Sequence, residues 1–135
     1  MEQQIKVSCQ KSNLKKIRTF LKECLAGSAL PSTDAHLVVV AVDEVCANLM
    51  IHSHNCNPKV YIELRLYEAD GYLTIDIYDQ GDAFNIDTYQ EPPLEKVIQD
   101  RKSGGMGLIL VKRIMDHISV LQSQGYNIYR MQKAI

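Results

Sequence analysis

Hydrophobic residues recur at two different spacings along this chain. Alternating polar and apolar residues predict β-strands, whereas apolar residues three or four positions apart predict amphipathic helices. The predicted strands are Gln3–Cys9, Lys59–Glu68, Tyr72–Tyr78, Ile118–Ser123 and Tyr126–Gln132. The predicted helices are Leu14–Leu25, about Thr33–His52 and Leu108–Met115, with a further short helix around Leu94–Gln99.

Turn residues divide these elements in a way that indicates their pairing. The sequence Glu-Ala-Asp-Gly at 68–71 is typical of a hairpin turn between antiparallel strands, and Gly125 predicts a second hairpin near the end. Ser12 or Asn13 can cap the first helix, and Gly27 can end it. The element order predicts an α+β fold of one domain (residues 1–135), a two-layer sandwich with helices packed on one face of a mainly antiparallel mixed sheet.

Composition and charge narrow the range of functions. The 135 residues carry a net charge of -1, so nothing indicates a nucleic-acid footprint or a basic membrane-binding face. A run of cations between Lys11 and Lys22 falls on a helical pattern and is interpreted as a solvated face. The four cysteines lack C-x-x-C spacing, which indicates free thiols in a reducing compartment. The first residues lack the apolar run of a signal peptide, so we expect a cytoplasmic protein.

Three polar residues interrupt the apolar second helix at four-residue intervals. Glu44, Asn48 and His52 would lie along one helical face. They could mark the wet edge of an amphipathic helix, but the stripe is narrow and so is predicted to face a cleft. There an acid can serve as a general base, and an amide oxygen can ligate Mg²⁺. His52 is the weakest member of the three and is better explained by a structural role, and the stretch HSHNC lacks the second ligand pair of a zinc site.

Two further polar stretches follow. DQGDAF (residues 79–84) comes directly after a predicted strand, where Asp and Gly often form a simple turn. KSGGMGLILVKRIMD (residues 102–116) places three glycines before an apolar helix. Such glycines can bring backbone N–H groups close to phosphate oxygens, or can merely relieve crowding at a helix entry. The stretch matches neither a P-loop nor a dinucleotide fingerprint.

Together these motifs resemble a known family. E-x-x-x-N on a helix, D-x-G at a strand end and G-x-G opening a helix are similar to the N, G1 and G2 boxes of the GHKL (Bergerat-fold) ATPase/kinase superfamily. The stretches EVCANLMIHSH and SGGMGLILVKRIMD resemble its anti-sigma-factor serine/threonine kinase branch in particular. The resemblance extends from about residue 30 to the C-terminus.

The resemblance implies roles for the matching residues. Glu44 would be the catalytic base, Asn48 would hold Mg²⁺, and Asp79 would accept a hydrogen bond from the adenine amino group. Gly81 would let the chain turn beneath the base, Gly105 and Gly107 would contact the triphosphate, and residues 86–103 would form a lid. The other implied nucleotide-binding positions are His52, Ala83, Lys102, Gly104, Met106, Leu108 and Asn127.

The resemblance also implies a function. The protein would bind ATP and Mg²⁺, sequester a sigma factor and phosphorylate a serine on a STAS-type anti-sigma-factor antagonist, as a homodimer with no direct nucleic-acid or membrane partner. The alternative is a nucleotide-gated protein-binding regulator with little or no kinase activity. Two departures from relatives motivate it: Arg101 and Lys102 are displaced from the position of an arginine before the glycines, and Gly125-Tyr126-Asn127 replaces Gly-Thr. A plain ATPase fragment of a larger machine is a third reading, disfavoured by the complete-looking ends of the chain.

Overall fold

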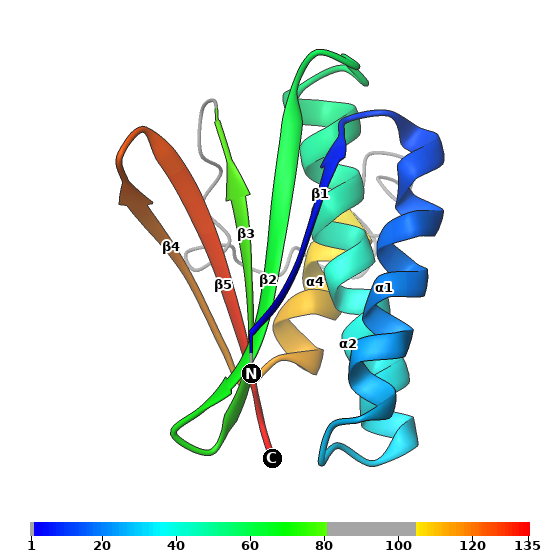
Figure 1. Cartoon of the computed structure of the whole chain (residues 1–135), viewed down its shortest axis with the longest axis vertical. Coiled ribbons are helices and arrows are strands. Elements are labelled where there is room, and N and C mark those ends of the chain that lie inside the picture. The colour runs from blue at the N-terminus through cyan, green and yellow to red at the C-terminus, as the bar shows by residue number, and fades with distance from the viewer. Residues whose placement is uncertain (1, 81–104) are drawn as a thin grey trace.

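The protein folds into two layers, a β-sheet and a group of helices that covers one of its faces (Figure 1). The computed structural model describes residues 2–80 and 105–135. In this part of the chain the strands form one antiparallel sheet in the order β1-β2-β3-β5-β4. Their bounds are β1 Gln3–Ser8, β2 Tyr61–Ala69, β3 Tyr72–Asp79, β4 His117–Ser123 and β5 Tyr126–Ala134. The α+β two-layer prediction is confirmed, with every described strand pair antiparallel.

The helices are amphipathic, and their apolar sides face the sheet. A 3₁₀ turn, η1 (Lys11–Asn13), leads into α1 (Leu14–Ala26), which ends at the predicted Gly27. The second helix is α2 (Ser32–Ala47), which continues as a π-helix, η2 (Asn48–Ser53). After the undescribed segment, α4 (Gly105–Ile114) packs against α2. The predicted short helix at 94–99 lies outside the described residues.

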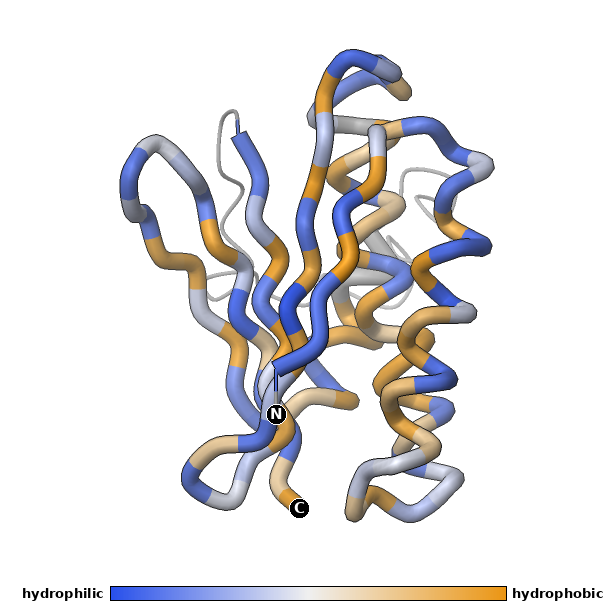
Figure 2. Tube along the Cα trace, in the orientation of Figure 1, coloured by the Kyte–Doolittle hydropathy of each residue, from blue (hydrophilic) through white to orange (hydrophobic). Residues whose placement is uncertain are grey.

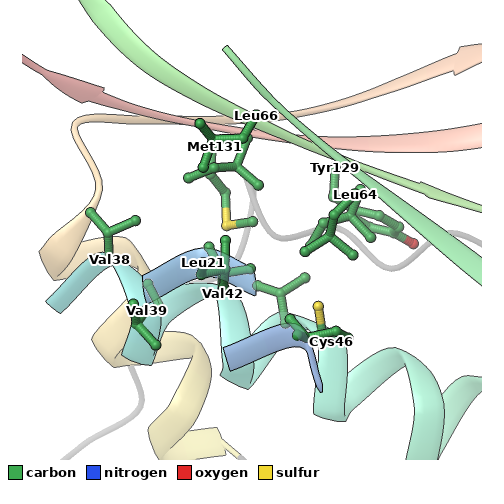
Figure 3. Packing of buried hydrophobic residues seen from close by; sticks show 14 of the residues in the cluster. Leu21, Val38, Val39, Val42, Cys46, Leu64, Leu66, Tyr129 and Met131 are labelled. Atoms are coloured by element: carbon green, nitrogen blue, oxygen red, sulfur yellow. The ribbon is translucent and has the colours of Figure 1, made fainter. Parts of the chain in front are cut away.

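The core lies between the two layers. Leu64 and Tyr129 point from the sheet toward the helices, where Val42 and Cys46 of α2 meet them (Figure 3). All four side chains are fully buried. Along the strands apolar and polar positions alternate (Figure 2), so one face of the sheet contacts the helices and the other carries polar groups.

The polar face of the sheet contains a hydrogen-bonded ion pair. Asp76 on β3 is 2% exposed, and both of its carboxylate oxygens accept bonds of 2.9 Å from the guanidinium of Arg130 on β5. The hydroxyl of Tyr67 donates to the same carboxylate at 3.0 Å. A buried carboxylate is tolerated here because its oxygens are paired.

The predicted hairpins are confirmed by their backbone geometry. Asp70 and Gly71 have φ values of 54° and 81°, and Gln124 and Gly125 have 52° and 82°. Two successive residues at positive φ form the turn that matches the twist of a two-residue hairpin. These turns fix the register in which Ala69 faces Tyr72.

We expect Gly71→Ala to destabilise the fold by about 1–2 kcal/mol, because an L side chain disfavours positive φ. The cost should come from the backbone alone, since no atom lies within 4 Å of an added Cβ. Gly27→Ala is the matched control, since Gly27 has an ordinary φ of -93°. Urea denaturation of both variants checks this; equal unfolding free energies would contradict it.

Several predicted boundaries were wrong by a few residues. Strand β2 begins at Tyr61 and not at Lys59, because the backbone N–H of Lys59 donates to the side chain of Asn57 in a local turn.

The cation run is not wholly solvated: Arg18 on α1 donates to Asp43 on α2 at 3.1 Å and so joins the two helices.

The remaining sequence predictions concern thiols and membranes. All four cysteines are free, and Cys9, Cys24 and Cys46 are buried in the core. None of the described helices combines the length and the apolar character needed to cross a bilayer.

Candidate functional site

The first part of the candidate site is the junction of α2 with η2. Glu44 lies in the last turn of α2, and the backbone N–H of Asn48 bonds to its carbonyl oxygen. Their side chains are therefore one helical turn apart and both half-buried. Burial, and secondly the neighbouring Asp43 carboxylate, raises the pKa of Glu44 above its ordinary value. The structure thus brings the predicted pair together, and the roles of Glu44 as base and Asn48 as metal ligand stay predictions.

The helix changes its winding at Asn48. From Asn48 to Ser53 it is a π-helix, and the backbone N–H of His54 bonds to the carbonyl of Leu49, five residues back, at 3.0 Å. The prediction of regular four-residue stacking from Glu44 through His52 is therefore wrong beyond Asn48, because the wider turn changes the direction of later residues. The side chain of His52 lies outside the described part of the structure.

The second part is the end of β3, where Asp79 is completely buried (0% exposed). One carboxylate oxygen, Oδ1, pairs with Nε2 of His54, and the other, Oδ2, has no hydrogen-bond partner within the described residues. Burial raises the pKa of Asp79, while the bond and charge of His54 and the backbone of Gln80 oppose the rise. A buried oxygen without a partner costs free energy, so it is a natural acceptor for a ligand's N–H group.

Asn127 lies on β5 directly opposite Asp79. Residues opposite each other in antiparallel strands share a face of the sheet, so both side chains belong to the helix-facing side. Asn127 is 5% exposed, and its side-chain oxygen accepts a hydrogen bond of 3.2 Å from Gln122 on β4. The structure thus brings this predicted residue beside Asp79, and its contact with adenine stays a prediction.

The third part is the start of α4. This helix begins at Gly105, so the backbone N–H groups of Gly105, Met106 and Gly107 belong to its first turn, where N–H groups lack intrahelical acceptors. Their positive end favours anions. Because α4 packs against α2, the predicted phosphate-binding helix is next to the helix that carries Glu44.

Several predicted site residues cannot be placed. Side chains of Met106 and Leu108 fall outside the described part of the structure, although their backbone is helical. Gly81, Ala83, Lys102 and Gly104 lie outside the described residues, as does the predicted lid at 86–103.

Sequence reasoning missed His54. Its ring is 8% exposed and contacts Asp79, which follows it by 25 residues. The HSHNC stretch suggests a metal site at most, and the described residues hold no group of three His, Cys, Asp or Glu side chains placed for a metal. The histidine itself was the available signal, but only the fold shows that the loop after η2 reaches the end of β3.

Comparison with known proteins identifies the family. The profile described as "Histidine kinase-like ATPase domain" matches residues 7–133, and the chain therefore belongs to this family. The resemblance to GHKL ATPases and kinases is thereby confirmed.

A serine-protein kinase is among the proteins similar in sequence to this chain. The chain is 32% identical over 96 residues to the serine-protein kinase RsbW of Halalkalibacterium halodurans. The match covers 68% of this chain and 58% of that relative, so the chain spans little more than half of the relative's length.

Solved structures support the fold. The RsbU and RsbW domains of a Mycobacterium tuberculosis protein superpose with a TM-score of 0.69 at 16% identity, covering 99% of this chain and 32% of that chain. The SiaB-SiaC complex from Pseudomonas aeruginosa gives 0.65 at 13% identity, covering 98% and 89%. At such identities the likeness concerns the fold alone.

Proposed function

We propose that this protein is an ATP- and Mg²⁺-dependent serine/threonine protein kinase of the anti-sigma-factor type. It would sequester a sigma factor and phosphorylate a serine on a STAS-type antagonist, as a cytoplasmic homodimer. The family match, the similarity to RsbW and the intact Glu44–Asn48 pair support this proposal.

One observation carries the nucleotide part of the proposal. Asp79 Oδ2 is buried and has no partner in the described part of the chain. The exocyclic amino group of adenine is a hydrogen-bond donor that would satisfy this oxygen. The residues therefore fit the base that the family implies.

The metal would require few protein ligands. Mg²⁺ is usually held by one or two protein oxygens together with substrate phosphates and water, and when bound it neutralises charge on the phosphates. The side-chain oxygen of Asn48 would be that protein ligand. The first-turn N–H groups of α4 would orient the phosphates from the neighbouring helix.

Glu44 would act on the protein substrate. Burial raises its pKa, which makes its ionised carboxylate a stronger proton acceptor than that of an exposed glutamate. It would take the proton of a serine hydroxyl as the phosphoryl group is transferred.

A paired measurement tests the proposal against the alternative regulator. Titration calorimetry with Mg·ATP reports nucleotide binding, and radiolabelled ATP with a STAS-type antagonist reports transfer to serine. Binding together with transfer supports the kinase. Binding with partner capture but without transfer would support the nucleotide-gated regulator, and the absence of nucleotide binding would overturn both.

We expect Asp79→Asn to weaken Mg·ATP binding by about 1–3 kcal/mol, or about 5- to 150-fold in Kd, because an amide is a mismatched partner at a buried site. Asp70→Asn is the matched control: Asp70 is exposed in a hairpin turn whose positive φ suits asparagine. Calorimetry of the two variants checks the expectation, and equal affinity would show that Asp79 does not read the base.

A further inference from the structure

We propose that His54 is a specificity-determining residue: it holds Asp79 so that the remaining carboxylate oxygen selects a 6-amino purine over a 6-oxo purine. This inference rests on the proposed nucleotide site. Neither the resemblance nor the motif residues assign a role to His54.

The first step is the direction of the hydrogen bond. An ionised carboxylate can only accept, so Nε2 of His54 carries the proton that bonds to Oδ1 of Asp79. This bond fixes the rotation of the carboxylate. Oδ2 is then the acceptor left for the ligand, and it has no other partner in the described part of the chain.

The second step is the way in which the backbone places the ring. The π-helix ends at Ser53, and the N–H of Cys56 bonds to the carbonyl of Met50 at 2.8 Å. Asn55 and Cys56 follow with φ values of 54° and 55°, a conformation that is unfavourable for a cysteine. Wider helical winding and positive φ in successive residues often mark functional positions. Here they flank the residue that contacts Asp79.

The third step is the charge of the carboxylate. Burial raises the pKa of Asp79, and His54 is the main group that opposes this rise. Cys9, whose own pKa is raised to about 11 by burial, is neutral at pH 7 and so adds no charge beside Asp79. Without His54, Asp79 would take up a proton at a higher pH.

Other titratable groups line the same hollow as His54. His54 lines a hollow of about 480 Å³ together with residues of β1, β2, β3, β5 and the preceding loop. The titratable side chains of this hollow are Lys6, Lys59, Tyr61, Glu63, Tyr78 and Tyr126, and Cys56 follows in the same loop. These side chains include both positive and negative groups. Asp79 is the one whose carboxylate is hydrogen-bonded to the ring of His54.

The chemistry of the base follows from the state of Asp79. A carboxylate accepts a hydrogen bond from the amino group of adenine but repels the carbonyl oxygen of hypoxanthine. A protonated Asp79 can donate a hydrogen bond to that carbonyl oxygen, so the site then no longer prefers adenine over hypoxanthine. His54 therefore determines both the orientation and the ionisation on which the choice depends.

The experiment measures Kd for Mg·ATP and Mg·ITP between pH 5.5 and 8.5 by calorimetry. In the wild type we expect ATP to be preferred, and the preference to fall as pH falls through the raised pKa of Asp79. His54→Phe removes the donor and should reduce the ATP/ITP preference at pH 7 by on the order of tenfold. In this variant the preference should also begin to fall at a higher pH than in the wild type, because Asp79 takes up a proton more readily. His54→Gln keeps a donor and should restore part of the preference, which a merely structural role would not require.

His36→Phe is the matched control, because His36 is exposed on α2 and should leave the profile unchanged. A wild-type ATP/ITP ratio and pH profile in His54→Gln and in His54→Phe would overturn the inference while leaving the proposed function intact. If His54→Phe does not fold, His54→Ala also removes the donor, and a wild-type ratio and pH profile in His54→Ala decides against the inference. If the wild type binds no nucleotide, the proposed function fails and the inference fails with it.

Discussion

Replacing Glu44 by glutamine should reduce phosphate transfer to the antagonist serine by about 10²–10⁴-fold while leaving nucleotide binding nearly unchanged. Glutamine has almost the same shape as glutamate but cannot accept the serine proton. In the wild type the raised pKa of Glu44 has a further consequence. Because the base must be ionised, the rate should fall as pH is lowered through a pKa above that of an exposed glutamate.

Initial rates of transfer at saturating Mg·ATP, measured across pH, test this expectation. Glu68→Gln is the matched control, since Glu68 is exposed at the far end of β2. Transfer at the wild-type rate in Glu44→Gln would remove Glu44 as the base. Loss of transfer together with loss of Mg·ATP binding would show instead that the residue serves to hold the nucleotide.

The second large effect concerns stability. Leu64→Ala should lower the free energy of unfolding by about 2–5 kcal/mol, because it removes a fully buried side chain between the sheet and α2. Figure 3 shows Leu64 directed toward the helices beside Tyr129. The core residues around Leu64 belong to regular strands and helices, which cannot readily move to fill the cavity that the substitution leaves.

Leu121→Ala makes the same chemical change on β4 at a side chain that is 38% exposed, and should cost far less. Urea denaturation of both variants measures the difference. If the two substitutions had similar effects, the layer between sheet and helices would not be the main source of stability.

The fold could be predicted from the sequence because local patterns and turn residues agreed. Leu14, Ile17 and Leu21 are buried at helical spacing on α1, and Gly27 ends that helix as predicted. Asp70-Gly71 has the positive φ values that its sequence indicates. Strand order was not accessible in this way: β5 lies between β3 and β4, and only tertiary packing determines that a late strand enters the sheet there.

The site was predictable only where its residues belong to local motifs. Glu44 and Asn48 are neighbours because of helix geometry, so the spacing in the sequence was sufficient. Asp79 could be placed at a strand end, but its pairing with His54 joins a loop to a strand 25 residues away. The π-helix was also beyond the pattern, because apolar spacing does not distinguish five-residue from four-residue hydrogen bonding over so short a stretch.

The change of winding at Asn48 divides one continuous helical segment into two parts, one carrying Glu44 and the other leading to His54. Residues before it keep the register of α2, whereas those after it are set by the wider turn, so His54 is oriented independently of Glu44. We expect the removal of one residue from Asn48–Ser53 to restore ordinary winding and to turn His54 away from Asp79, while Glu44 keeps its place in α2. Under the roles proposed here, such a deletion should change which purine is accepted and leave the proton-accepting group of the transfer step in place.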